Sequence, residues 1–180
     1  FMEMKSNFIT NNHKLERLHT EIWEGFIYVT LSKKPKKSIA KSLDGLRKNI
    51  VGQYDMARYK TVIRERMSWN ANWKNIIENF TESYHVPIAH PKTFASHKKQ
   101  IKDYECGEDS DDYCYHFAPQ ESDKGSGAAH PLNTNLKGKW RRTMVDFCIF
   151  PNHLVTLMPD YLWWVSVMPK GVGGFEATWG

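Results

Sequence analysis

The sequence predicts an α+β fold in which an antiparallel sheet carries one strongly amphipathic helix. Two observations favour this class. Residues 144–168 contain runs of alternating apolar residues separated by Pro-Asn and Pro-Asp turn dipeptides, a pattern typical of an antiparallel meander. Residues 73–84 place apolar side chains at helical spacing, in the stripe Trp73, Ile76, Ile77, Phe80 and Tyr84.

The composition is that of an ordinary globular chain. Its 180 residues, 41% hydrophobic and 25% charged, are enough for one domain with a sizeable core. The net charge of +5 is scattered along the chain, so it does not indicate a nucleic-acid partner. The sequence has no signal-peptide pattern and no apolar run of spanning length, and its cysteines form no CxxC pair. We therefore expect a cytoplasmic protein with no membrane or nucleic-acid partner.

Two elements are predicted in the first third of the chain. Residues 17–31 end in a strand over 26–31, and because both of its faces are apolar we expect it to be buried on both sides. Residues 38–51 place Ile39, Leu43, Leu46 and Ile50 at helical spacing opposite lysine and arginine, which predicts a surface helix.

The central region continues with a strand, the amphipathic helix and an irregular segment. Residues 59–69 alternate, which predicts a long strand with one wet face, and Asn70 or Asn72 then caps the helix. Within the polar segment 92–139 we expect a short strand at 112–117 and a loop at 120–130, either mobile surface or a lid. A further strand at 175–179 would extend the meander.

Side chains suited to metal chemistry cluster just after the amphipathic helix. His85 and His90 are five positions apart, a spacing that does not share one face of an unbroken helix. Pro87 disrupts the helix it sits in, so we expect the chain to turn after His85 and His90 to swing back. Glu82, one turn earlier, is then either a third ligand or an acceptor for an imidazole N–H, and Asn79 lines up one turn before it.

The same stretch resembles the catalytic domain of Rieske non-heme iron oxygenase α subunits. Those proteins carry NWK, ENF, an acid, YH and HP in this order and at closely similar spacing. The matching residues here are Asn72-Trp73-Lys74, Glu78-Asn79-Phe80, Glu82, Tyr84-His85 and His90-Pro91.

The resemblance implies a fold and a role for each matched residue. The fold would be the helix-grip type (Bet v 1-like, START-like), an antiparallel sheet around a long helix, truncated here at both ends. His85 and His90 would be two of three Fe(II) ligands. Glu82 would be the acid that bridges the iron site to a neighbouring subunit's Rieske cluster, and Asn79 would stand near the iron.

The resemblance also implies what surrounds this chain in a complete enzyme. Residues 1–180 would be a single catalytic-domain fragment, inactive by itself. The domain with the [2Fe-2S] Rieske cluster would precede Phe1, and the helix with the third ligand, an aspartate, would follow Gly180. Electrons from NAD(P)H would arrive through a reductase or ferredoxin. A homotrimer would then use mononuclear iron and O2 to hydroxylate or dealkylate an organic substrate, a quaternary amine or an aromatic acid.

Two other functions and one substrate feature remain open from the sequence. The same fold can serve as a non-enzymatic ligand-binding module, and His85, His90 and Glu82 also suit a zinc hydrolase. Tyr161, Trp163 and Trp164 either form part of an aromatic box for a quaternary ammonium or belong to the sheet core.

Overall fold

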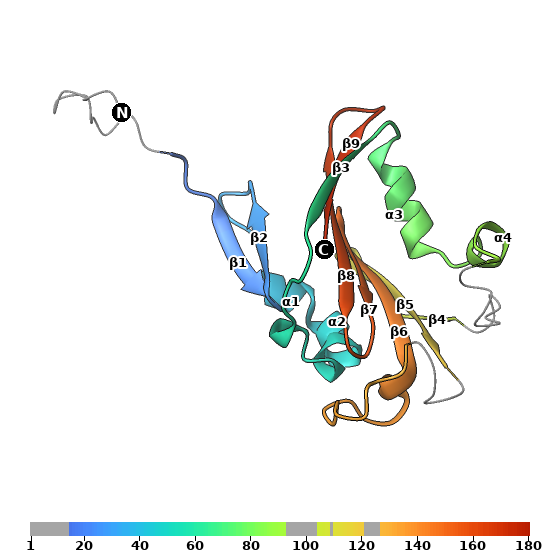
Figure 1. Ribbon diagram of the computed structural model, residues 1–180. Coiled ribbons are helices and arrows are strands. Elements are labelled where there is room, and N and C mark those ends of the chain that lie inside the picture. The colour runs from blue at the N-terminus through green and yellow to red at the C-terminus, as the bar shows by residue number, and fades with distance from the viewer. Residues whose placement is uncertain (1–14, 93–103, 109, 121–126) are drawn as a thin grey trace, which may run out of the picture.

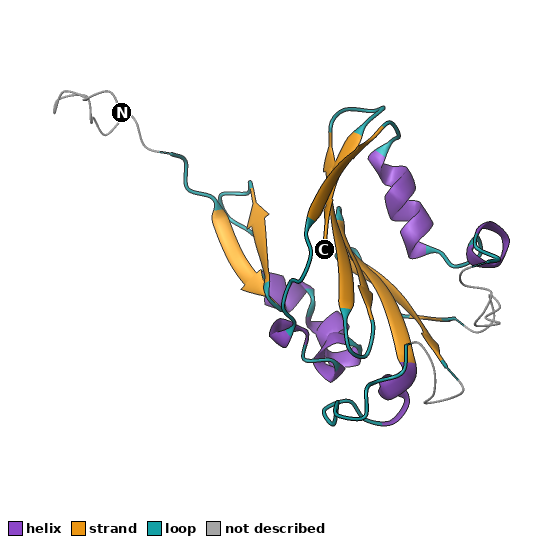
Figure 2. Ribbon diagram, viewed as in Figure 1, coloured by secondary structure: helices purple, strands orange, loops and turns teal. Residues whose placement is uncertain are grey.

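A seven-stranded antiparallel sheet lies at the centre of the computed structural model, which describes residues 15–92, 104–108, 110–120 and 127–180 (Figures 1 and 2). The strand order is β3-β9-β8-β7-β6-β5-β4. The strands are β3 Glu65–Trp69, β4 Glu105–Cys106, β5 Tyr113–Pro119, β6 Thr143–Ile149, β7 His153–Leu157, β8 Leu162–Pro169 and β9 Phe175–Trp179. The predicted meander, its fourth strand and the short strand near 112–117 are confirmed.

The turn residues of the meander also hold neighbouring segments in place. Asn152, in the β6–β7 turn, donates from its side-chain amide to the Val167 carbonyl of β8 at 2.7 Å. In the β7–β8 turn, the Pro159 carbonyl accepts from Asn133 Nδ2 at 2.9 Å, and the same amide reaches Asp160 Oδ1 at 2.8 Å. These bonds fix the turns that the Pro-Asn and Pro-Asp dipeptides predict.

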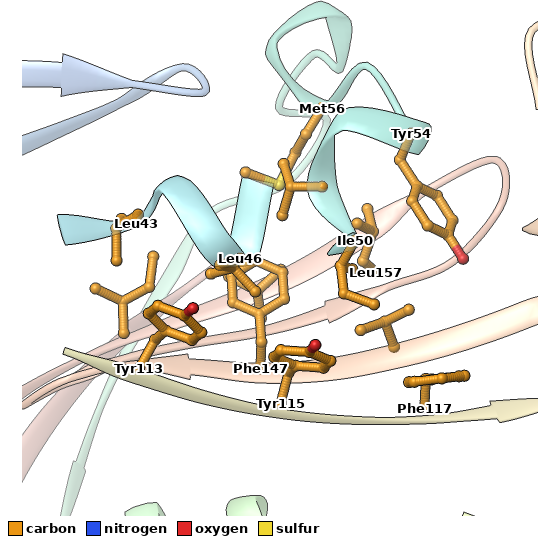
Figure 3. Close-up of a cluster of buried hydrophobic side chains, with 14 of the residues drawn as sticks. Leu43, Leu46, Ile50, Tyr54, Met56, Tyr113, Tyr115, Phe117, Phe147 and Leu157 are labelled. Atoms are coloured by element: carbon orange, nitrogen blue, oxygen red, sulfur yellow. The ribbon is translucent and has the colours of Figure 1, made fainter. Parts of the chain in front are cut away.

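Short helices from the first third of the chain cover one face of the sheet. They are α1 Ile39–Ser42 and α2 Asp44–Asn49, followed by 3-10 turns at Val51–Gln53 and Met56–Arg58. The predicted apolar side of this segment does pack on the sheet, but the prediction of one continuous helix is wrong, because the chain bends at Leu43, where α1 ends and α2 begins. Figure 3 shows this core, in which side chains of the helices meet β5, β6 and β7 through Leu43, Leu46, Ile50, Tyr54, Met56, Tyr113, Tyr115, Phe117, Phe147 and Leu157.

The amphipathic helix α3, Trp73–Thr81, covers the opposite face (Figure 1). Asn72 caps it by accepting from Lys74 N at 3.0 Å, as one of the two predicted caps. Ile77 is buried against the sheet, with other stripe residues packed around it: Trp73, Ile76 and Phe80. Tyr84 was predicted to complete this stripe, but it lies beyond the helix end and is 63% exposed.

The strand predicted over 59–69 is shorter, and more exposed to solvent, than its alternating pattern suggests. Only β3, Glu65–Trp69, is a strand, and all five of its residues are exposed. It stands at the edge of the sheet and pairs with β9 alone. Alternation therefore predicted the strand but not its environment, because an edge strand has a neighbouring strand on one side only.

The first two strands form a separate hairpin beside the main sheet (Figure 1). β1 His19–Trp23 and β2 Phe26–Thr30 are joined at Glu24 and Gly25, whose φ angles of 48° and 86° suit a tight hairpin turn. The prediction that the second strand is buried on both sides is wrong. Phe26 and Tyr28 pack against the core, while the other face is open.

His153 holds this hairpin to the sheet. The Tyr28 hydroxyl shares a hydrogen bond of 2.7 Å with His153 Nδ1, and the Phe26 ring lies 4.5 Å from the imidazole between centroids. The residue is only 7% exposed and its Nε2 has no hydrogen-bond partner. This burial disfavours the charged imidazolium and lowers the pKa of His153 from 6.5 to about 4.

Stability is expected to fall as the pH drops through this range. The unfolded chain takes up a proton near pH 6.5 and the folded chain only near pH 4, so the full contribution of neutral His153 is present above 6.5 and is lost progressively below it. The loss is at most about 3 kcal/mol between these limits. Urea unfolding of the full-length protein at several pH values measures it. The His153→Gln variant, which cannot titrate, should flatten the dependence, and an unchanged slope would contradict this origin.

Two further sequence expectations concern the loop before β6 and the absence of a membrane-spanning segment. The predicted loop at 120–130 falls largely outside the described residues, which omit 121–126. Within the described part of the chain, no helix combines the length and the apolar character needed to cross a bilayer.

Candidate metal centre

The two histidines lie on either side of a short helix that follows α3. The chain leaves α3 at Thr81 and runs extended at Glu82, and α4, Val86–Ala89, then lies between His85 and His90. Pro87 stands in the first turn of α4, where proline is tolerated. The sequence prediction that Pro87 breaks the helix after His85 is therefore wrong, since the break comes earlier, at Glu82.

This break brings the imidazoles together and attaches the acid to one of them. The His85 and His90 ring centroids are 5.4 Å apart with the rings inclined at 74°. Glu82 binds His85 twice. Its Oε2 accepts from the His85 backbone N–H at 3.1 Å, and its Oε1 shares a hydrogen bond with the ring Nδ1. The His85 and Glu82 side chains are about four-fifths buried, at 21% and 19% exposure.

This donor set fits part of a mononuclear iron site. An imidazole held at Nδ1 by a carboxylate is fixed in orientation and keeps Nε2 for a metal, an arrangement common around protein-bound metals. His85 and His90 therefore suit two ligand positions. Glu82 is engaged with His85, which favours the acceptor role over the role of third ligand.

The third ligand is not found among the described residues. In that part of the chain, no group of three or more His, Cys, Asp or Glu side chains is arranged to hold a metal ion. Asp146 contacts Thr156 and His116, and Asp160 accepts from the His130 backbone N–H. Both carboxylates thus have partners outside the pair of histidines.

Asn79 was the fourth residue that the resemblance placed at the iron site. Asn79 lies on α3 and is exposed, and its predicted place beside the iron stays a prediction.

Trp163 and Trp164 lie on opposite faces of β8, so they do not form one aromatic box. Trp164 packs near Phe26 at 5.7 Å on the side of the N-terminal helices, whereas Trp163 lies 6.3 Å from Phe80 of α3.

The structure also reveals a polar cluster that sequence reasoning missed. Asp146 Oδ1 accepts a hydrogen bond of 2.5 Å from the Thr156 hydroxyl, and His116 Nε2 lies 3.4 Å from Asp146 Oδ2. His116 is buried, at 7% exposure. The available signal was a polar residue within each of three otherwise apolar strand segments, CYHFA, VDFCI and LVTL. Only the strand register shows that the three meet.

Comparison with known proteins places the chain close to one group. A family model described as the ring hydroxylating α subunit, catalytic domain, matches residues 56–180. The chain is 30% identical over 90 residues to the glycine betaine monooxygenase oxygenase subunit of Pseudomonas aeruginosa, a match that spans 50% of this chain and 20% of that protein.

Solved structures confirm the predicted fold. A quaternary ammonium Rieske monooxygenase, CntA, matches with a TM-score of 0.70 at 18% identity, over 90% of this chain and 41% of that one. Naphthalene 1,2-dioxygenase with indole bound matches with a TM-score of 0.59 at 14% identity, over 90% and 43%. The chain thus spans less than half of each of these proteins.

Proposed function

Since the chain belongs to the ring hydroxylating α-subunit family, whose catalytic-domain model covers residues 56–180, we propose that it forms the iron-bearing part of a Rieske-type oxygenase. The observation that carries the proposal is the arrangement of Glu82, His85 and His90. Two imidazoles lie ring to ring, and the more buried of them is held by a carboxylate. The order of these residues matches the motif by which the sequence resembles the family.

Each residue of the arrangement has a defined task in the proposed enzyme. His85 and His90 would hold Fe(II), which when bound supplies oxygen activation to the site. Glu82 Oε1 would accept a hydrogen bond from the Nδ1–H of His85, which fixes the tautomer and leaves Nε2 for the metal. Asn79 would lie near the metal. Glu82 would also carry electrons into the site from the Rieske cluster of a neighbouring subunit.

The proposed enzyme would also need a source of electrons, a third metal ligand and a substrate. A domain with a [2Fe-2S] cluster would receive electrons from NAD(P)H through a reductase or ferredoxin, and a homotrimer would bring the cluster of one subunit to the iron of the next. A helix beyond residue 180 would supply the third ligand. The substrate would be a quaternary amine or an aromatic acid, hydroxylated or dealkylated with O2. The similarity to glycine betaine monooxygenase and CntA supports the first class.

The other two functions have less support. A zinc hydrolase would need Glu82 as ligand or as base for a bound water, yet both of its oxygens are engaged with His85. A non-enzymatic module of the same fold does not account for two histidines and an acid brought together at the end of α3.

Metal analysis of the purified full-length protein tests the proposal. We expect about three iron atoms per chain, one mononuclear and two in the cluster, with acid-labile sulfide for the cluster alone. We also expect O2 uptake on addition of NADH, reductase and a quaternary amine. Zinc alone, or no metal in protein purified without chelators, would rule the oxygenase out.

Replacing Glu82 by glutamine separates its possible roles. If Glu82 orients His85 and carries electrons, E82Q keeps its mononuclear iron but oxidises substrate about 10- to 100-fold more slowly. Single-turnover oxidation of the reduced cluster, followed in a stopped-flow instrument, measures the electron-transfer step itself. E78Q changes an exposed glutamate of α3 and is the matched control. Loss of iron from E82Q would contradict an electron-transfer role alone and would show that Glu82 is needed to hold the metal.

A further inference from the structure

A row of side chains crosses the sheet on the face that α3 covers. Its members lie directly opposite one another on five successive strands, as the pairs Cys106–His116, His116–Asp146, Asp146–Thr156 and Thr156–Trp163 show. The row runs beside the apolar patch on which Ile77 of α3 packs. It therefore lies on the same side of the sheet as the helix that leads into the candidate metal centre.

Among the described residues of strands β4 to β8, Asp146 is the only carboxylate on this face, and none of these residues on it is a lysine or arginine. The other positions are apolar or neutral apart from His116. The face consists of Cys106 on β4, Cys114, His116 and Ala118 on β5, Met144, Asp146 and Cys148 on β6, Leu154 and Thr156 on β7, and Trp163, Val165, Val167 and Pro169 on β8.

The carboxylate of Asp146 is only partly satisfied by its neighbours. Oδ1 receives the short bond from Thr156, but the 3.4 Å between Oδ2 and His116 Nε2 exceeds the usual length of an N–H···O bond. The Asp146 side chain is 14% exposed. Removing a carboxylate from water costs free energy unless a positive charge or several donors face it. A cation bound beside Oδ2 would offset that cost.

Aromatic rings stand at one end of the row. Trp163 lies opposite Thr156 and keeps 38% of its surface exposed. Its ring is 6.3 Å from that of Phe80, in the last turn of α3, five residues before His85. Aromatic faces attract cations, and most strongly those with little hydration, such as quaternary ammonium groups. The row thus offers a carboxylate and exposed aromatic surface on the metal-bearing side of the sheet.

We propose that Asp146, with Trp163 and Phe80, binds the cationic head of a quaternary ammonium substrate. This inference rests on the proposed oxygenase function and decides between its two substrate classes. An aromatic acid has no cationic group to pair with Asp146, whereas a trimethylammonium group gains both the counter-charge and the aromatic contact. Asp146 is thereby a specificity-determining residue, and His116 and Thr156 position its carboxylate.

Two ligands of equal shape test the charge directly. Glycine betaine, a zwitterion, and its isostere tert-butylacetate, an anion, share a carboxylate and three methyl groups and differ only in the central atom, which is a cationic nitrogen in the first and an uncharged carbon in the second. Binding of each to the full-length, iron-loaded enzyme is measured by titration calorimetry. In D146N we expect glycine betaine to bind at least about tenfold more weakly, and the isostere to change by less than about twofold. W163L should show the same selective loss, and W163F should restore part of it.

A carboxylate on the opposite face of the sheet provides the control. E176Q removes a carboxylate from the opposite face of the sheet, where Glu176 pairs with Arg66 at 3.4 Å, and should leave both ligands unaffected. Equal weakening of both ligands in D146N, or no weakening of either, would overturn the inference. W163L keeps it testable if D146N does not fold, because Trp163 is partly exposed.

Metal analysis of the same samples separates this inference from the proposed function. If the enzyme contains iron and takes up O2, but the variants still bind glycine betaine as tightly as the parent does, the role of Asp146 is refuted and the oxygenase function is not. Protein without iron that still distinguishes betaine from its isostere through Asp146 refutes the oxygenase and supports the cation site.

Discussion

Replacing His85 by alanine in the full-length protein is expected to remove the mononuclear iron and to lower substrate oxidation by more than about 100-fold. The imidazole of His85 is the one that Glu82 orients, and its side chain is 21% exposed, so no other group can take its place without rearrangement. Iron should fall by about one atom per chain, while acid-labile sulfide, which reports the cluster, stays unchanged. H90A should have the same effect.

A histidine far from the centre provides the control. His19 lies on the β1–β2 hairpin and contacts Glu21, so H19A should retain iron and turnover. Full iron content and normal oxidation in H85A would show that the metal lies elsewhere. The circular dichroism spectrum of H85A should match that of the parent, because α4 forms without the side chain of its preceding residue.

Truncating Phe147 to alanine is expected to cost about 3 to 5 kcal/mol of unfolding free energy. Phe147 is 1% exposed and stands in the middle of β6, opposite Tyr115 and Val155, where the N-terminal helices pack on the sheet (Figure 3). Alanine would leave a cavity that the surrounding strands cannot close, because their register is fixed by hydrogen bonds on both sides. Chemical denaturation of the full-length protein measures the loss.

Milder and exposed substitutions bracket this value. F147L keeps most of the volume and should cost about a third as much, so it gives a reading even if F147A does not fold. V172A changes a residue that is 82% exposed and should alter stability by less than about 0.5 kcal/mol. A cost below about 1 kcal/mol for F147A would show that this face of the sheet is not the main core.

The alternation of apolar residues and the residues typical of turns were sufficient to predict the meander. The Pro-Asn and Pro-Asp dipeptides and the alternating runs within residues 144–168 predicted the strands β6, β7 and β8, and the helical stripe predicted α3 with Asn72 as one of two possible caps. These signals are local, since each depends on neighbours a few positions away. The spacing of His85 and His90, together with Pro87, likewise predicted that the two histidines come together, although α3 ends at Glu82 and the predicted turn after His85 is instead the short helix α4.

Features that depend on distant partners could not be predicted in the same way. The apolar residues on both faces of β2 predicted a strand buried on both sides. In the structure one face contacts His153 and the core, and the other face is exposed. The sequence of β2 alone does not show which face has a partner. Residues 59–64 alternate without becoming a strand, because β9 offers pairing only to residues 65–69. The contact of His116 with Asp146 joins residues thirty positions apart, which no local pattern indicates.

The candidate cation site depends on the number of residues in each turn, because the row of side chains from Cys106 to Trp163 is formed by the register of five strands. Side chains alternate between faces along a strand, so shifting one strand by a single residue moves its member of the row to the opposite side. A one-residue insertion at Asn152 that slides β7 would replace Thr156 by Val155 or Leu157 opposite Asp146. An insertion of two residues would return a side chain to the correct face but bring Leu154 or Met158 to that position. Length changes in these turns therefore alter ligand preference without changing any residue that contacts the ligand.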